Sequence, residues 1–250
     1  MITEYHRPKT LDEALRLLQQ ADAAPLGGGT LLSHSKANTL QAVDLQLLGL
    51  DTLRNKGNDL ELGGALTLQT FLESDHCPSA VKQALKLEAP LNLRNAATVA
   101  GTLVACDGRS TFATVLLALD AKLTIQSAEQ PTSTVNIGDF LPLRNIRGSL
   151  ITAITIPATV KLAFEYVART PSDKPIVCVA VAGWGSGRRR MAVGGFGKNP
   201  TLAMDGTESD DLTVAAQNAC HEAQDDYGSA AYRMDVAGTL IRRCAETLAQ

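Results

Sequence analysis

A run of three glycines, Gly27-Gly28-Gly29, constrains the fold of this chain more than any other stretch. Glycine has no side chain to pack, so such a run suits a tight turn or a close approach of the backbone to a ligand. Bare amide groups beside the hydroxyls of Thr30 and Ser33 would make a cradle for phosphate oxygens. The alternative interpretation is a flexible surface turn. The rest of the chain has to decide between these two.

The composition excludes several classes of function. The chain has 250 residues, of which 45% are hydrophobic and 20% charged, as expected for a globular protein of one large or two modest domains. Its net charge of −3 leaves no basic footprint for nucleic acid. No apolar run is long enough to span a membrane. We expect the basic run Arg188-Arg189-Arg190 to be the solvated tip of a hairpin.

The N-terminus and the cysteines bear on location and metal content. Residues 1–8 contain no apolar signal core. The five cysteines include no C-x-x-C pair, and the four histidines are equally dispersed. Neither a disulfide framework nor an iron–sulfur or zinc site is indicated. We therefore expect buried thiols in a protein of the reducing cytoplasm.

The elements before the glycine run argue against a Rossmann loop. Thr10 and Glu13 form a capping box, which predicts a helix from Leu11 to about Ala21. A Rossmann loop needs G-x-G-x-x-G between a strand and a helix. Here the glycines follow a short strand expected at residues 23–26, and no amphipathic helix begins directly after them. We reject the Rossmann interpretation.

A second stretch of small residues and hydroxyls, LRNAATVAGTL, runs from Leu93 to Leu103. On the residues alone, positions 94–111 suit a tight helix and loop packed against a core as well as they suit a ligand loop. A buried helix is expected at 112–121, followed by a strand at 122–126.

The pattern changes near Pro157, and we predict a domain boundary between residues 157 and 160. Two strands, at 177–184 and 190–196, are joined by a glycine-rich turn and predict a hairpin within a small antiparallel sheet. Two helices, at 212–222 and 230–248, are expected to complete this part.

Several stretches, taken in order, resemble the FAD-binding (medium) subunit of the molybdenum hydroxylases, the family of xanthine dehydrogenase and aerobic carbon monoxide dehydrogenase. Near its start that family has Pro-x-(Ser/Thr)-x-x-Glu-Ala, and its two flavin loops read Ala-Gly-Gly-Thr-Asp-Leu-Leu and Arg-Asn-x-Ala-Thr-Ile-Gly-Gly-Asn. The corresponding sequences here are PKTLDEA at 8–14, GGGTLL at 27–32 and RNAATVAGT at 94–102. Two further family sequences recur as LLALDA at 116–121 and DDYGSAAYR at 225–233. The resemblance covers nearly the whole chain.

This resemblance implies an α+β fold of the molybdopterin-dehydrogenase (PCMH-like) type. The expected FAD-binding domain covers residues 1–158, with subdomains of about 1–54 and 55–158. A small C-terminal domain of antiparallel sheet and helices would then cover residues 159–250.

The resemblance also implies an FAD site. Amides of residues 27–31 and 99–102 would donate to the pyrophosphate, and the isoalloxazine ring would lie near Leu150, Ile151 and Tyr166. The expected cofactor-binding residues are Leu26, Gly27, Gly28, Gly29, Thr30, Leu31, Leu32, Ser33, Thr98, Val99, Ala100, Gly101, Thr102, Thr111, Leu150 and Tyr166.

In such a complex, electrons pass from a molybdenum-cofactor large subunit through [2Fe-2S] clusters on a small subunit to the flavin. The flavin then passes them to an external acceptor. The cofactor carries out the redox chemistry, so no catalytic side chain is required of this chain.

Four departures from the family pattern are present. Leu31 and Thr111 stand where the family has Asp, residues 100–102 read Ala-Gly-Thr in place of Gly-Gly-Asn, and Tyr166 replaces a frequent Lys. These departures define a second hypothesis, a degenerate, flavin-free scaffold subunit of the same kind of complex. A third hypothesis is a flavin oxidase with FAD attached covalently through His34, for which a solvated loop histidine is the plain alternative.

Overall fold

The computed structural model describes residues 2–32, 40–171, 173–207 and 212–249. By its internal contacts the chain divides into two compact units. The first unit comprises Met1–Ser74, Leu91–Ala105 and Lys122–Thr155, and the second comprises Asp75–Pro90, Cys106–Ala121 and Ile156–Gln250. The first unit lies entirely before the predicted boundary near residue 158, whereas the second unit contains segments from both sides of it. That boundary concerns family domains and stays a prediction.

The first unit begins with a small parallel sheet of order β1-β3-β2. Its elements are β1 (Ile2–His6), α1 (Leu11–Leu17), β2 (Ala23–Leu26) and β3 (Leu40–Asp44). The capping box is present, because the Thr10 hydroxyl accepts from the Glu13 amide at 3.3 Å and the Glu13 carboxylate accepts from the Lys9 amide at 3.0 Å. The helix ends at Leu17, earlier than the expected Ala21. A turn, in which the Ala23 amide donates to the Gln20 carbonyl at 3.2 Å, leads into β2 instead.

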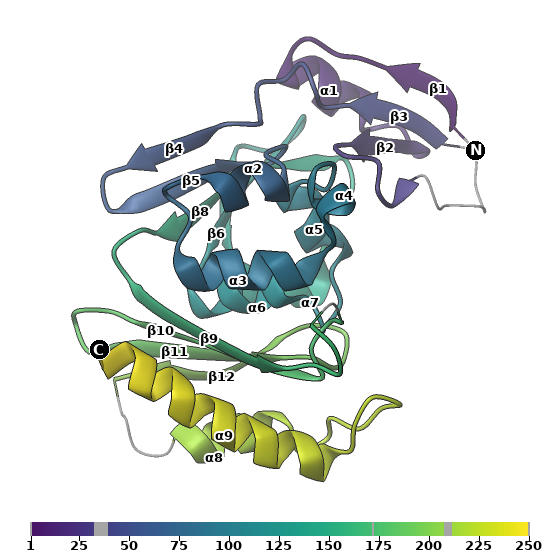
Figure 1. The fold of residues 1–250 in the computed structure, drawn as a ribbon. Helices are drawn as coiled ribbons and strands as arrows, with labels where there is room; N and C mark the ends of the chain where they lie inside the picture. Colours follow the sequence, from purple (N-terminus) through teal and green to yellow (C-terminus); the bar gives the residue numbers. More distant parts are fainter. Residues whose placement is uncertain (1, 33–39, 172, 208–211, 250) are drawn as a thin grey trace. The chain divides into compact units, whose positions relative to one another are not determined.

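The rest of the first unit is a five-stranded sheet with short helices (Figure 1). The strand order is β4-β5-β8-β6-β7. The strands are β4 (Leu53–Lys56), β5 (Asp59–Gly63), β6 (Lys122–Ser127), β7 (Ser133–Asn136) and β8 (Ser149–Pro157). The helices are α2 (Leu68–Glu73), α4 (Leu91–Arg94), α5 (Val99–Ala105) and α7 (Ile137–Leu143). Thr67 caps α2 by accepting from the Thr70 amide at 3.1 Å.

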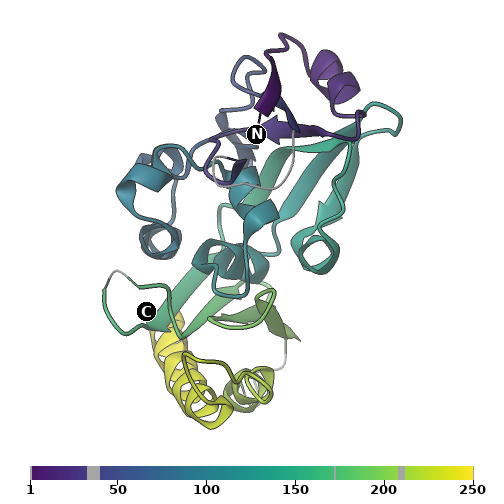
Figure 2. The ribbon, with the colours of Figure 1, turned by 90° about the vertical axis from the view of Figure 1, so that its right-hand side faces the viewer.

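The second unit is a sheet covered by helices on both faces (Figures 1 and 2). The antiparallel sheet has the order β12-β11-β10-β9. Its strands are β9 (Lys161–Val167), β10 (Val177–Gly183), β11 (Arg189–Gly194) and β12 (Thr201–Gly206), the last of which the sequence analysis missed. Helices α3 (Ser79–Glu88) and α6 (Thr111–Ala118) cover one face, and α8 (Leu212–Ala219) and α9 (Ala230–Ala249) cover the other.

Alternation along β10 explains this layering. Val177, Val179 and Val181 belong to the apolar core that contains Leu240 of α9. The intervening Cys178 faces the opposite way, with its thiol 3.8 Å from the Thr114 hydroxyl of α6. Successive side chains of a strand point to opposite faces, so a strand without polar positions is buried on both. The structure confirms the predicted α+β class.

The basic run contradicts its prediction as a solvated tip. Arg190 is only 6% exposed, and its guanidinium donates to the Leu117 carbonyl at the end of α6. Arg188 and Arg190 both pair with Asp205 of β12, with N–O distances of 2.7 and 2.5 Å. The hydrogen bond from Arg188 lowers the pKa of Asp205. The run therefore ties the hairpin to β12 and α6.

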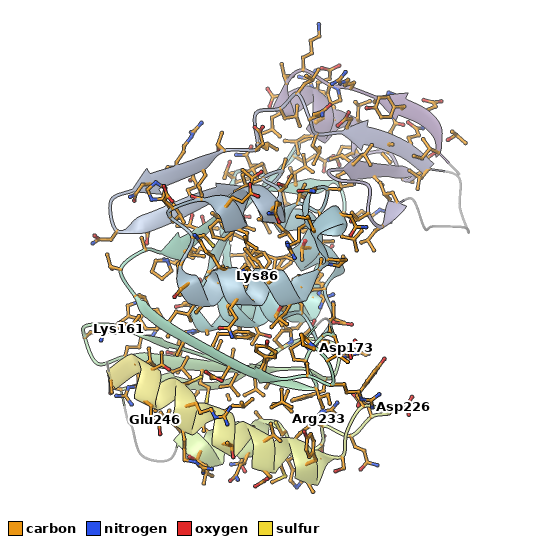
Figure 3. The ribbon with its side chains drawn as sticks, in the orientation of Figure 1. Lys86, Lys161, Asp173, Asp226, Arg233 and Glu246 are labelled. Carbon is orange, nitrogen blue, oxygen red and sulfur yellow. The ribbon has the colours of Figure 1, made fainter. Side chains whose placement is uncertain are left out.

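Arg233 has a structural role near the start of α9. It has no exposed surface and donates to the carbonyls of Ile176, Ala223 and Gly228 and to the carboxylate of Asp225. Although burial acts to raise it, the pKa of Asp225 is lowered by the hydrogen bond from Arg233 and by neighbouring amides. Figure 3 labels Arg233 near the start of α9 and Asp226 on the preceding turn.

Candidate functional site

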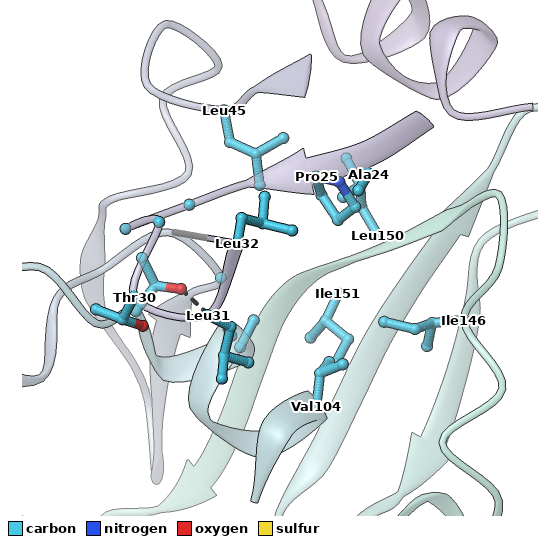
Figure 4. Close-up of a pocket in the computed structure, with 17 residues that line it drawn as sticks. Ala24, Pro25, Thr30, Leu31, Leu32, Leu45, Val104, Ile146, Leu150 and Ile151 are labelled. Carbon is cyan, nitrogen blue, oxygen red and sulfur yellow. Dashed lines mark hydrogen bonds between the residues drawn. The ribbon is translucent and has the colours of Figure 1, made fainter. Parts of the chain in front are cut away.

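An apolar cavity of about 240 Å³ lies within the first unit, and both small-residue loops contribute to it (Figure 4). The first loop, residues 26–32, follows β2, and the second loop, residues 94–102, leads into α5. Leu45, Val104, Ile146, Leu150 and Ile151 form much of the apolar wall. The remaining lining residues are Ala24, Pro25, Gly27, Gly28, Gly29, Thr30, Leu31, Leu32, Gly64, Thr98, Ala100 and Gly101. No ionisable side chain occurs in this described lining.

The glycines of the first loop are required by its contact with the second. A Cβ on Gly28 would collide with the Ala96 carbonyl oxygen, and a Cβ on Gly27 would lie 2.9 Å from the Thr98 hydroxyl oxygen. Gly29 has a φ of 69°, a conformation that L residues rarely adopt. The glycines at positions 27 and 28 are therefore explained by the close packing of the first loop against the second.

Some backbone amides of the first loop have no backbone acceptor in the described chain. Within the described chain, the backbone amides of Gly27, Gly28 and Leu31 donate to no backbone carbonyl outside the regular elements. The neighbouring Leu26 carbonyl accepts from the Leu45 amide at 3.1 Å, which anchors the loop where β2 ends. Consecutive amides without internal partners form the kind of concavity that binds an anion.

The amides of the second loop are satisfied inside the chain. Val99 donates to the Leu66 carbonyl at 2.9 Å and Ala100 to the Gly64 carbonyl at 3.2 Å. Gly101 donates to the Thr98 hydroxyl at 3.1 Å, and Thr102 donates to the Thr98 carbonyl at 2.9 Å. Residues 98–102 are thus the capped first turn of α5. They are not the row of open phosphate donors that the sequence analysis expected.

The predicted site residues fall into four groups. Most of the first loop lines the cavity together with Thr98, Ala100, Gly101 and Leu150. Leu26, Val99 and Thr102 lie on the same loops but not on the lining, and the Thr102 hydroxyl donates to the Thr98 carbonyl at 2.8 Å. Ser33 and His34 lie outside the described residues.

Thr111 and Tyr166 belong to the second unit. Thr111 has no exposed surface, and its hydroxyl donates to the Ala84 carbonyl at 2.7 Å. It is part of a buried core, and its predicted contact with the cofactor stays a prediction. Tyr166 is half-buried on β9 and stacks against Phe164, with ring centroids 6.0 Å apart. Its predicted role at the flavin stays a prediction.

Several lining residues were missed by the sequence analysis. Ala24 and Pro25 belong to β2, Leu45 follows β3, and Gly64 and Ile146 come from turns far along the chain. A Cβ on Gly64 would collide with the Ile151 carbonyl oxygen, so a glycine is needed where the chain after β5 packs against β8. The one signal for Gly64 in the sequence was its position next to Gly63, directly after a stretch of alternating apolar and polar residues.

The described residues offer no site for a metal. No group of three or more histidine, cysteine, aspartate and glutamate side chains there could hold an ion. All five cysteines are buried and free, and burial raises the pKa of Cys77 and of Cys178 to about 12. None of the helices in the described part is long and apolar enough to cross a membrane.

The fold is that of chains in known oxidoreductase structures. A chain of the Cu,Mo-CO dehydrogenase structure superposes with a TM-score of 0.83 at 25% identity, covering 99% of this chain and 98% of that one. A chain of quinoline 2-oxidoreductase from Pseudomonas putida 86 shares the fold, with a TM-score of 0.82 at 21% identity. The class is thus an oxidoreductase subunit.

The chain belongs to the family described as "FAD binding domain in molybdopterin dehydrogenase", which matches residues 1–159. Similar chains include the uncharacterized protein YgfM of Escherichia coli (strain K12), 29% identical with 96% of this chain and 94% of that protein covered. The glyceraldehyde dehydrogenase medium chain of Sulfolobus acidocaldarius is 26% identical, with 98% of each chain covered. The carbon monoxide dehydrogenase medium chain of Afipia carboxidovorans is 25% identical, covering 97% and 95%. The resemblance found in the motifs is confirmed, and the first unit carries most of an FAD-binding domain.

The cavity fits FAD at the first loop. Backbone amides without a backbone acceptor suit a pyrophosphate, and the apolar wall suits an aromatic ring system. The second loop contributes surface at Thr98, Ala100 and Gly101, not amide donors.

Proposed function

We propose that this chain is the FAD-binding, electron-transfer subunit of a multi-subunit molybdenum hydroxylase. It would take electrons from [2Fe-2S] clusters on a small subunit, supplied by a molybdenum-cofactor large subunit, and pass them to an external acceptor. One observation carries the proposal. Two loops some 70 residues apart in the sequence close on a single cavity within the first unit.

The protein's part in this function is to hold and orient the cofactor, which supplies the redox chemistry when bound. We assign the pyrophosphate to the amides of Gly27, Gly28 and Leu31. Leu150 and Ile151 would contact a ring of the dinucleotide, and Ala100 and Gly101 would close the cavity opposite. Because none of the described lining residues is charged, the phosphate charges would be met by backbone dipoles alone.

The medium-chain relatives support the assembly. The similar proteins include medium chains of glyceraldehyde dehydrogenase and carbon monoxide dehydrogenase, names that place them beside other subunits. The chain covers 98% and 95% of these two relatives, which is nearly the full length of each. Activity is therefore expected in the complex and not in the isolated chain.

One observation favours the second hypothesis, the flavin-free scaffold. The second loop has no open amide among residues 99–102, and the exposed side chain of Leu31 stands where the family has an acid. We give more weight to the first loop, because its amides without a backbone acceptor can donate to an anion.

The test is the visible absorption spectrum of the purified chain after incubation with FAD and removal of free flavin. We expect flavin bands that remain with the protein and are bleached by dithionite. A colourless protein that takes up no FAD would overturn the proposal and leave the scaffold hypothesis. Flavin that stays with the chain after denaturation would instead revive covalent attachment.

The electron-transfer part has a separate test. In the complex with both partner subunits, substrate added to the molybdenum subunit should bleach the flavin bands of this chain. A bound flavin that stays oxidised while the clusters become reduced would contradict this part alone.

A further inference from the structure

A second cavity, of about 310 Å³, lies in the first unit beside the apolar one. The two cavities share Gly27, Gly28, Leu45 and Thr98, so the first loop forms a wall of both. The second cavity is also lined by Gln46, Asp51, Thr67 and Asn95, none of which lines the apolar cavity. It is a distinct and polar space.

Most polar side chains of this second cavity already have partners. The Gln46 side-chain oxygen accepts from Arg7 at 2.7 Å. The hydroxyls of Thr67 and Thr98 each accept from an amide at the start of a helix, at 3.1 Å. These groups hold the walls in place.

Two side chains of the lining are left without a partner. Asp51 and Asn95 are exposed, and in the described part of the chain neither side chain makes a hydrogen bond or an ion pair. Asp51 is the one ionisable residue of this described lining. A carboxylate only accepts hydrogen bonds, and the carboxamide of Asn95 offers one further acceptor.

These acceptors determine the chemistry of a ligand. Phosphate or another anion would be repelled by Asp51. A guanidinium or ammonium group carries the complementary charge, and its hydrogen bonds to a carboxylate are roughly twice as strong as neutral ones. A guanidinium offers five N–H donors in a fixed plane, enough for Asp51 and Asn95 together.

We propose that this polar cavity is a second binding site, for a cationic hydrogen-bond donor of the guanidinium type, and that its occupation steadies the first loop. The second part rests on the proposed function. Gly28 packs directly on the Ala96 backbone, and both residues line the polar cavity. A cation held there therefore favours the loop arrangement that also shapes the apolar cavity. Such a coupling is reciprocal, so FAD and the cation each raise the affinity for the other.

The cation can come from an arginine side chain of a partner protein or from a free guanidino compound. Both present the same group to Asp51, and the arms of the experiment separate them.

The first arm is calorimetric titration of the full chain with Nα-acetyl-arginine amide, with the neutral isostere Nα-acetyl-citrulline amide as control. We expect the arginine compound to bind and the citrulline compound not to. Asp51→Asn should weaken binding about tenfold or more, as for the loss of a charge-assisted hydrogen bond. Asp59→Asn, at an exposed position of the same unit outside the lining, should leave it unchanged. Equal binding of the two compounds, no binding of either, or an unaffected Asp51→Asn variant would overturn the site.

The second arm measures FAD affinity with and without saturating Nα-acetyl-arginine amide. We expect a several-fold increase in the wild type and no increase in Asp51→Asn. An unchanged FAD affinity would overturn the coupling. If the wild type binds no FAD at all, the proposed function fails, while the result of the first arm still stands for the cation site.

The third arm identifies the source. If Asp51→Asn weakens assembly with the large and small subunits and Asp59→Asn does not, the cation is a partner's side chain. If assembly is unchanged while the arginine compound binds, the ligand is a free compound.

Discussion

The two loops at the apolar cavity look alike in sequence and differ in chemistry. Both are rich in glycine, alanine and threonine, and both line the cavity. In the first loop the amides of Gly27 and Gly28 are open, whereas in the second the amides of residues 99–102 are bound within the chain. A run of small residues therefore indicates close backbone approach, and the hydrogen bonds decide whether the approach is to a ligand or to another segment.

Thr111 resembles the second loop, because its hydrogen-bonding group also has partners within the chain. Its hydroxyl donates to the Ala84 carbonyl and lies beside the buried carboxylate of Glu88. That carboxylate also accepts from the Ser110 hydroxyl at 2.8 Å and from the Phe112 amide at 2.9 Å. The family acid at this position would meet Glu88 directly, so the departure at Thr111 is explained by packing within the second unit.

The largest expected effect follows from placing the family residue there. Thr111→Asp would bring a second carboxylate against Glu88 in a buried position, at a cost of about 3 kcal/mol or more in unfolding free energy at pH 7. The repulsion raises the folded-state pKa of one of the two carboxyls, so the loss should shrink as the pH falls through that raised value. Urea unfolding at pH 7 and pH 5 measures both effects, and Thr111→Ser is the matched control. A Thr111→Asp protein as stable as the wild type at both pH values would show that Thr111 is not confined as described.

Gly28→Ala comes next and tests the contact between the loops. The new Cβ would collide with the Ala96 carbonyl, so the loops must separate, and we expect a loss of about 2–3 kcal/mol together with weaker FAD binding. Gly185→Ala is the control, since a Cβ there meets nothing within 4 Å. Equal stability of the two variants by thermal unfolding would mean that the loops do not pack as the structure has them.

Thr98→Ala tests the cap of α5 and should have an intermediate effect. Removing the hydroxyl leaves the Gly101 amide without its acceptor, which typically costs about 1 kcal/mol. Thr132→Ala, at an exposed position, should change the unfolding free energy by less than about 0.5 kcal/mol. If both substitutions prove equally mild in urea titrations, the Gly101 amide is not held by the Thr98 hydroxyl as the structure has it.

The smallest effect is expected for Ala100→Gly. Position 100 lies in α5, where glycine is less favourable than alanine by about 0.5–1 kcal/mol. FAD affinity should not rise, because the amide of this residue donates to the Gly64 carbonyl at 3.2 Å. A clear gain in FAD affinity, measured by fluorescence titration, would show instead that the methyl group had kept phosphate away.

The sequence predicted those features that depend on neighbouring residues. The cap at Thr10, the hairpin of β10 and β11, and the long helix α9 all follow from local signals and were found. The family resemblance was likewise carried by local motifs.

Long-range pairing set the limits of prediction. Arg190 was expected in solvent because its partners, Asp205 and the Leu117 carbonyl, lie far along the chain. The engaged amides of the second loop depend on the carbonyls of Gly64 and Leu66, which sequence does not place. Asp51 and Asn95 gave no local sign that they would line one cavity.

The most direct test of the central claim is amide-resolved NMR of the chain titrated with FAD. The account predicts large shifts for the amides of Gly27, Gly28 and Leu31, as their open N–H groups gain phosphate acceptors. It predicts much smaller shifts for the amides of residues 99–102, which keep their internal carbonyl and hydroxyl partners. Large shifts confined to residues 99–102, with the first loop unchanged, would contradict it.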